Sequence, residues 1–434
     1  MTLKVRMHEW EQLAPAQMPE LAHFSFGENH QARMLAEQLA RAEILKIIEL
    51  RNGLSIRSTS YVGRLQLGEL QVTIQPKIKL DVLLTLFRYA YHLRDLHLLS
   101  DTDLDAEPDA FQDMLIEQLA AEASELIARG LYRQYRRLDE DLAAPKGKID
   151  LQRIAKNGGV IESTIPVIHH PRLENCLINQ VLLAGLYFAA TLTGDLVMRS
   201  RLRRLAGIIE VNVDLISLDF HTLRRLRREM SRLTAHYEPA ITLIELLLQS
   251  TGITLEDQTE KVSLQGFLFD MNRFFERLLS RFLNENLPDF IVHDQYRLTG
   301  MMSYAHEHNP RRRKAPTPRP DFVVTQGNKV LAILDAKYRD LWDQSLPREM
   351  LYQLALYALS QGWNGQATIL YPVIWADVRH QVIEIREPVL GTSTARVILQ
   401  PVNLNQLTEA IKDKTSRSTE NRIQLAQNWI FGGR

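Results

Sequence analysis

The stretch from Pro320 to Lys337 constrains the fold of this chain more than any other. Two apolar runs, residues 322–324 and 330–334, have the length and the β-branched content of buried strands. The intervening Gln326-Gly327-Asn328 sequence is typical of a turn, so we expect the two strands to form an antiparallel hairpin.

Charged residues stand at both ends of this predicted hairpin. Asp321 precedes the first run, Asp335 closes the second, and Lys337 follows two residues later. An antiparallel pairing brings these ends together, so both carboxylates and the lysine would share one small volume. Paired carboxylates are suitable ligands for a hard divalent cation, and a nearby lysine suits phosphodiester hydrolysis. The alternative is two strand-end aspartates and a solvated lysine.

Helices expected on either side of the hairpin add polar residues. Apolar residues at helical spacing predict a helix over residues 265–286, with Glu276 at the edge of its apolar face. Glu276 would face a cleft or be a surface glutamate. A second helix, near residues 348–361, places Gln353 and Tyr357 on one face. They would orient phosphate or water, or be ordinary helix residues.

A proline-rich segment precedes the hairpin. Residues 300–320 contain four prolines, which are incompatible with regular structure and predict a loop. It carries four consecutive cations, Arg311, Arg312, Arg313 and Lys314. These would hold the backbone of a nucleic acid, or the segment would be a flexible connector.

The chain has 434 residues, enough for two or three domains. We expect an α/β protein overall. The predicted domains are a mixed α+β domain over 1–100, a mainly helical region over 101–255, and an α/β domain with a mixed sheet flanked by helices over 256–434. In detail, residues 1–28 should be irregular, residues 31–50 should be mostly one helix, and the acidic residues 101–109 should form a linker or cap.

Arginines concentrate within residues 199–232. They would track a phosphate backbone or form a solvated face paired with nearby acids. The acids considered as partners are Glu210, Asp214, Asp219 and Glu229.

Composition excludes several classes of site. Lys+Arg and Asp+Glu are equal at 52 each, so net charge favours no partner. Cys176 is the single cysteine, which excludes an internal disulfide and argues against a cysteine-based zinc site. Adjacent His169 and His170 would point to opposite faces of a strand, so a structural or solvated role is favoured over a metal site. No signal-peptide core or membrane-length apolar run is found, and a cytoplasmic protein with no membrane association is expected.

The ordered set of Glu276, Asp321, Asp335-x-Lys337 and Gln353-x-x-x-Tyr357 resembles the PD-(D/E)xK nuclease superfamily, and its RecB-like branch in particular. Upstream motifs resemble the McrC family, the nuclease subunit of McrBC modification-dependent restriction systems, over about residues 60–385. They are Gln75-Pro76-Lys77-Ile78, Lys146-Gly147-Lys148-Ile149-Asp150, Arg172-Leu173-Glu174-Asn175 and residues 269–276. Where the family commonly has Gly-Arg-Ile-Asp, this chain has lysine at position 148, and the two cations differ in bidentate contacts.

The resemblance implies a metal-dependent DNA endonuclease acting in defence against foreign DNA. Asp321, Asp335 and the carbonyl of Ala336 would bind Mg²⁺, or alternatively Mn²⁺, with Glu276 assisting directly or through water. Lys337 would orient or deprotonate the attacking water, or stabilise the transition state. The substrate would be double-stranded DNA carrying a 5-methylcytosine-type modification.

The resemblance also implies a partner, a hexameric McrB-like AAA+ GTPase that binds GTP and is stimulated by this chain. The chain has no G-x-x-x-x-G-K-[ST] loop of its own. Residues 1–100 are the expected partner contact, because nothing in them looks catalytic. Two alternatives remain: a stand-alone RecB-like repair or processing nuclease, and a non-catalytic adaptor that activates an AAA+ ring.

Overall fold

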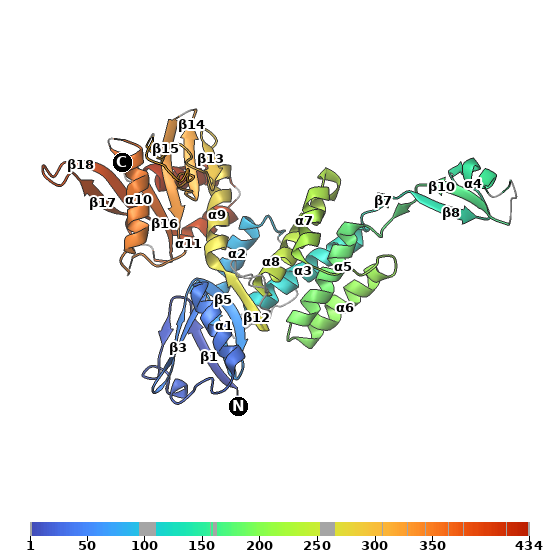
Figure 1. Ribbon diagram of the computed structural model, residues 1–434, viewed down its shortest axis with the longest axis horizontal. Coiled ribbons are helices and arrows are strands. Elements are labelled where there is room, and N and C mark those ends of the chain that lie inside the picture. The colour runs from blue at the N-terminus through green and yellow to red at the C-terminus, as the bar shows by residue number, and fades with distance from the viewer. Residues whose placement is uncertain are drawn as a thin grey trace. The chain divides into compact units, whose positions relative to one another are not determined.

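The computed structural model describes residues 2–94, 110–156, 158, 163–251, 265–305, 307–327, 329–342, 344–362, 364–375, 377–413 and 415–432 (Figure 1). The predicted linker at 101–109, both predicted domain boundaries and Asn328 lie outside these residues. The mixed α/β fold class is confirmed. The chain forms two compact units. Unit 1 combines Met1–Leu93 with Ile253–Arg434, and unit 2 is Arg94–Gly252. The division into three domains stays a prediction.

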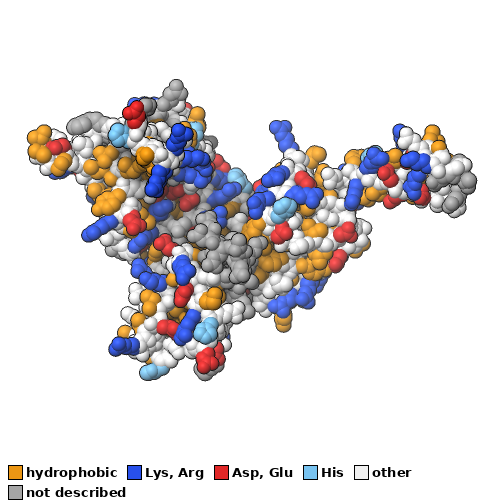
Figure 2. Space-filling view, in the orientation of Figure 1, with side chains coloured by type: hydrophobic (Ala, Val, Ile, Leu, Met, Phe, Trp, Pro, Cys, Tyr) orange, Lys and Arg blue, Asp and Glu red, His pale blue; other side chains and the backbone are white. Residues whose placement is uncertain are grey.

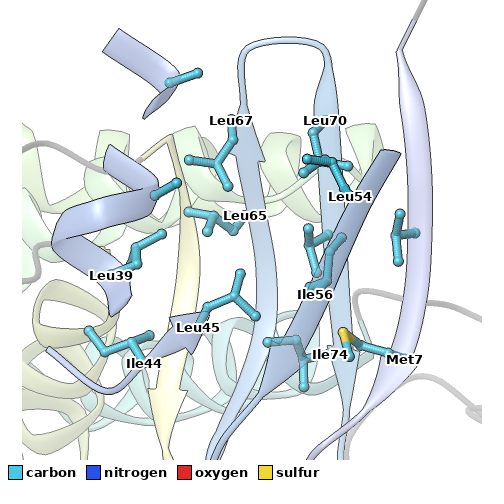
Figure 3. Close-up of a cluster of buried hydrophobic side chains, with 14 of the residues drawn as sticks. Met7, Leu39, Ile44, Leu45, Leu54, Ile56, Leu65, Leu67, Leu70 and Ile74 are labelled. Atoms are coloured by element: carbon cyan, nitrogen blue, oxygen red, sulfur yellow. The ribbon is translucent and has the colours of Figure 1, made fainter. Parts of the chain in front are cut away.

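The N-terminal part of unit 1 is built on two small sheets and a helix. The four-stranded sheet has the order β1-β6-β5-β12 and the three-stranded sheet the order β2-β4-β3. Their bounds are β1 Leu3–His8, β2 Gln12–Leu13, β3 Leu45–Leu50, β4 Gly53–Ser58, β5 Tyr61–Leu67, β6 Leu70–Gln75 and β12 Gln265–Asp270, with α1 at His30–Arg41. Figure 3 shows apolar side chains from these elements meeting in one core, among them Leu39, Ile56 and Leu65.

Three secondary-structure predictions are wrong here. Residues 1–28 are not irregular, because β1 pairs in parallel with β6. The helix predicted over 31–50 ends at Arg41, since Glu43 adopts a left-handed φ of 56° and β3 begins at Leu45. The helix predicted over 265–286 begins only at Met271, because β12 precedes it and pairs with β5. The side chain of Asp270 caps this helix by accepting from the backbone N–H groups of Asn272 and Arg273.

The C-terminal part of unit 1 contains a six-stranded mixed sheet in the order β13-β14-β15-β16-β18-β17. The predicted hairpin and mixed sheet are therefore confirmed: β14 and β15 are antiparallel, and β15 pairs in parallel with β16. Strand bounds are β13 Ile291–Asp294, β14 Phe322–Gln326, β15 Lys329–Ala336, β16 Gly365–Val373, β17 Gln381–Arg386 and β18 Ser393–Asn403. The helices are α2 Leu80–Ala90, α9 Met271–Asn286, α10 Arg348–Ser360, α11 Leu404–Lys412 and α12 Ser416–Phe431.

Unit 2 is mainly helical, as expected for the middle of the chain. Its longer helices are α3 Ala110–Arg129, α5 Leu177–Leu192, α6 Leu196–Glu210, α7 Phe220–Glu229 and α8 Glu238–Thr251. Between α3 and α5 lie β7 Gln134–Tyr135, β8 Leu138–Leu142, β9 Lys148–Ile149, α4 Leu151–Lys156, β10 Ile165–His169 and β11 Arg172–Leu173. The phenol of buried Tyr237 donates to Asn179 Oδ1 at 2.8 Å and accepts from the backbone N–H of Tyr132. No helix among the described residues combines the length and apolar character needed to cross a bilayer.

Within the arginine-rich segment 199–232, Arg225 and Arg227 form ion pairs with acidic residues. Arg227 is partly buried and paired with Glu238 and Glu245. Arg225 pairs with Glu229 at the surface. Of the other predicted partners, Asp219 caps α7, Asp214 accepts from Asn175, and Glu210 accepts from Tyr187. Besides Arg225, the exposed arginines within residues 199–232 are Arg203, Arg204, Arg224, Arg228 and Arg232.

Candidate active site at the end of the β14–β15 hairpin

The hairpin brings the two predicted aspartates together. Phe322 pairs with Leu334, so the register extended by one residue sets Asp321 opposite Asp335. Both are nearly inaccessible, at 7% and 4% exposure. Two carboxyl groups this deep in the protein need compensating donors or cations.

Lys337 supplies one such cation. Its Nζ lies 3.1 Å from Asp335 Oδ2 and 3.8 Å from Asp321 Oδ2. The lysine follows β15 directly, and its backbone N–H donates to the carbonyl of Leu370 on β16 at 2.9 Å. The central parallel pair of strands therefore fixes the point from which the ammonium group reaches both acids.

Asp321 is held by two further donors. The backbone N–H of Ala336 donates to Oδ2 at 2.8 Å, and the Gln295 side-chain amide donates to Oδ1 at 2.8 Å. The backbone N–H of Gln295 also donates to the carbonyl of Asp321 at 2.7 Å. Sequence reasoning missed Gln295. Gln295 directly follows β13, the strand that pairs with β14, and this position could have indicated that it lies near Asp321. The position alone does not predict that the residue is a glutamine.

Burial and mutual repulsion shape the electrostatics of the site. Burial, then the negative charge of Asp321, raises the pKa of Asp335 well above its usual range. The same two causes raise the pKa of Glu276 to about 7. Burial favours the neutral amine of Lys337, but the charges of Asp335 and Asp321 outweigh it and raise the lysine pKa. Three acidic groups thus share a single lysine at this site.

Glu276 and Lys337 line one cavity of about 610 Å³. Glu276, on α9, interacts electrostatically with Asp321, so the structure brings this predicted residue to the hairpin end. Tyr357, on α10, is also nearby: burial and the charges of Asp335 and Asp321 raise its pKa. The side-chain amide of Gln353 donates to the Tyr357 hydroxyl at 2.9 Å.

The four consecutive cations Arg311, Arg312, Arg313 and Lys314 are exposed on the loop that leads to β14. Asn309 shapes that loop: its amide donates to the carbonyl of Arg313, and its side-chain oxygen accepts the Arg313 N–H. Figure 2 shows Lys and Arg side chains gathered over the face that carries β14 and β15. Their contact with nucleic acid stays a prediction.

The chemistry of the donor set fits a divalent cation. Two buried carboxylates, with Glu276 beside them, offer hard oxygen ligands and excess negative charge. Among the described residues, no three His, Cys, Asp or Glu side chains form a complete metal cage. Such a site suits Mg²⁺, which keeps several waters and needs only one or two protein carboxylates. Asp321, Asp335 and the Ala336 carbonyl remain the predicted ligands.

Every polar group of Tyr338, the residue after Lys337, has a hydrogen-bond partner. Its phenol donates to Glu9 Oε1 at 2.8 Å, and its carbonyl accepts from the Trp10 indole at 3.1 Å. Its N–H donates to Asn272 Oδ1 at 3.1 Å, and the Asn272 amide donates to Ser60 Oγ at 2.6 Å. Residues from the N-terminal strands therefore support the backbone beside the site. Sequence reasoning gave no sign of this long-range contact.

Comparison with known proteins gives a family match over residues 56–372, to the model described as McrBC 5-methylcytosine restriction system component. No curated protein sequence matches. Among solved structures, a chain of the Thermococcus gammatolerans assembly of McrB AAA+ hexamers with bound McrC is similar in fold. It has a TM-score of 0.60 and 18% identity, covering 98% of this chain and 100% of that chain. A chain of the McrBC complex from the same organism has a TM-score of 0.47 and 18% identity, covering 66% and 88% respectively.

Proposed function

The chain belongs to the family of McrBC 5-methylcytosine restriction system components, and on that premise we propose that it is the endonuclease subunit of such a system. The observation that carries the proposal is Lys337 between Asp321 and Asp335, at the end of a hairpin in a mixed sheet. Buried acids bridged by a lysine beside a large cavity are suited to phosphodiester hydrolysis.

In the proposed reaction, Asp321, Asp335 and the carbonyl of Ala336 would hold Mg²⁺, and Mn²⁺ would suit the same oxygens. When bound, the cation would act as a Lewis acid and offset the negative charge that the phosphate gains in the transition state. Gln295 and the Ala336 N–H keep the Asp321 carboxylate oriented for this task. Lys337 donates a hydrogen bond to the phosphate or the attacking water. Glu276 faces the same cavity and orients that water.

The proposed partner is an McrB-like AAA+ GTPase ring, which binds the GTP. Support comes from the family and from the similarity in fold to a chain of the assembly described as McrB AAA+ hexamers with bound McrC. The proposed substrate is double-stranded DNA carrying 5-methylcytosine, the modification that the family description names.

The test is cleavage of methylated and unmethylated DNA with Mg²⁺, with and without the partner and GTP. Wild type with partner and GTP should cut methylated DNA. Asp335→Asn should reduce the rate by at least about a hundredfold, because a metal ligand loses its charge. Gln326→Ala, at the exposed turn of the same hairpin, is the matched control and should cut normally.

Circular dichroism and partner binding establish that each variant is folded. Wild-type cleavage rates from folded Asp335→Asn would refute the assignment of the site. Cutting by the isolated chain without GTP would instead indicate a stand-alone nuclease. Stimulated GTP hydrolysis without any cutting would indicate an adaptor.

A further inference from the structure

The cavity that contains Glu276 and Lys337 has a second wall, formed by the N-terminal strands. Its lining includes Lys46 on β3, Arg57 on β4 and Arg339 beyond β15. All of these residues belong to unit 1. A cavity of about 610 Å³ is much larger than the space that one cation and its waters require.

Lys46 and Arg57 are directly opposite each other in the antiparallel β3–β4 pair, so their side chains leave the sheet on the same face. The neighbouring pair, Ile47 and Ile56, turns inward, with Ile56 fully buried and Ile47 packed against the core. The strand alternation that builds the core therefore also directs both cations outward. Like charges in direct opposition are destabilising, so this arrangement calls for an anion.

Arg339 adds a third cation at the same wall. Its guanidinium lies 5.3 Å from the ring centroid of Trp10, and it donates to Gln344 Oε1 at 3.4 Å. Its buried Nε has no hydrogen-bond partner. Burial lowers the pKa of Arg339, and the positive charge of Arg57 lowers it further. The two guanidinium groups therefore repel each other electrostatically.

These cations lack internal compensation. Within the part of the chain that the structure describes, no carboxylate forms an ion pair with Lys46, Arg57 or Arg339. Glu43 and Glu276 also line the cavity, without pairing to any of the three. Several unpaired cations around a cavity that ends at Lys337 are suited to a ligand with repeated negative charges.

We propose that Lys46, Arg57 and Arg339 bind backbone phosphates of the DNA strand presented to Glu276 and Lys337. The N-terminal β3–β4 pair then acts as one wall of the substrate cleft. This inference rests on the proposed function, because it takes DNA as the ligand. It adds a phosphate-binding surface separate from the exposed loop cations at residues 311–314.

The test measures binding of a short fluorescent DNA duplex to the full chain by anisotropy, over a series of salt concentrations, with Ca²⁺ in place of Mg²⁺. Arg57→Ala should weaken binding about five- to tenfold at low salt and reduce the slope of log K against log salt by about 1, because one phosphate contact is lost. Lys46→Ala should act in the same direction, and Arg57→Lys should retain most of the affinity.

Arg51→Ala is the matched control. Arg51 is an exposed arginine at the turn end of the same β3–β4 pair and does not line the cavity. It should bind DNA as wild type does. Equal affinity and equal salt slope for Arg57→Ala, Lys46→Ala and Arg51→Ala would overturn the proposal. A loss of partner stimulation with unchanged DNA binding would overturn it too, by assigning the surface to the partner.

Cleavage assays separate this inference from the nuclease proposal. If wild type does not cut with partner and GTP, but Arg57→Ala still weakens DNA binding, the inference stands and the nuclease assignment fails. If wild type cuts, and Arg57→Ala binds and cuts equally well, the nuclease assignment stands and the inference fails.

Discussion

The buried carboxyl group of Glu9 accepts a hydrogen bond from the phenol of Tyr338 at 2.8 Å. Glu9 directly follows β1, and Tyr338 directly follows Lys337. Oε1 of Glu9 also accepts from the backbone N–H of Lys77, whereas Oε2 has no hydrogen-bond partner. The Glu9 carboxyl group thus links the residues beside the candidate site to the N-terminal part of the chain. Burial makes this carboxyl group hard to ionise.

Glu9 should make stability depend on pH. Burial raises its pKa from 4.5 to about 7, so between these values the folded state holds a proton that the unfolded state lacks. The contribution of the protonated Glu9 carboxyl group to the free energy of unfolding is complete below about pH 4, and it is lost as the pH rises through about 7. Glu9→Gln cannot ionise, so from about pH 4 to about pH 8 its free energy of unfolding should gain on wild type by on the order of 3 kcal/mol.

Urea unfolding of both proteins at the two pH values measures this difference. Asp335 and Glu276 titrate in both proteins, so their contributions cancel in the comparison. A gap between Glu9→Gln and wild type that does not change with pH would contradict the assignment to Glu9.

Gln295 should matter for catalysis, because it orients the Asp321 carboxylate. Gln295→Ala should lower cleavage by about 10- to 100-fold, the usual cost of losing a group that orients a metal ligand. Part of the loss should be recovered at higher Mg²⁺. Activity against Mg²⁺ concentration is the measurement, with Gln326→Ala as control. Unchanged Mg²⁺ dependence would show that Asp321 needs no such support.

Arg227 should stabilise unit 2 far more than its neighbour Arg225. Arg227 pairs with Glu245 at 2.7 Å and also with Glu238, in a half-buried setting. Arg227→Ala leaves those acids unpaired and should cost about 2–4 kcal/mol. Arg225 pairs with Glu229 at the surface, so Arg225→Ala should cost about 0.5 kcal/mol. Urea unfolding followed by helical circular dichroism compares them. Equal losses would show that the partly buried ion pairs of Arg227 contribute no more to stability than a surface pair does.

Alanine substitutions at two helical glycines should change protein stability in opposite directions. A Cβ on Gly185, in α5, would overlap buried Ile244 of α8, so Gly185→Ala should destabilise by about 1–3 kcal/mol. Gly207, in α6, has open space, and Gly207→Ala should stabilise by about 0.5–1 kcal/mol through helix propensity. Thermal unfolding measures both. A stabilised Gly185→Ala protein would mean that α5 and α8 pack less closely.

Local sequence signals identified the hairpin because its strands, turn and charged ends are contiguous. The same signals failed where apolar spacing was ambiguous. Residues 44–48 fit either a helix face or a strand, and the left-handed Glu43 decided between them. Residues 265–270 extend the apolar pattern of α9, yet they pair with β5, which lies far away in the sequence.

Side-chain interactions likewise differ in whether the sequence predicts them. Arg225 and Glu229 pair as i and i+4 neighbours, which sequence spacing allows one to anticipate. The pairing of Arg227 with Glu245 depends on how α7 packs near α8, and Asp219 serves as a helix cap. Gln295, Glu9 and Trp10 approach the candidate site only through tertiary contacts. No local pattern identifies them.

The pairing of β12 with β5 also sets an order of events during protein synthesis. The sheet β1-β6-β5-β12 places β12 beside β5, but β12 is translated only after the whole of unit 2. At about 5–20 residues per second, a gap of roughly 200 residues leaves the β5 edge without its partner for roughly 10–40 seconds. During that time the nascent chain exposes an unpaired strand edge. Such an edge can pair with another chain and cause aggregation, and chaperones protect surfaces of this kind.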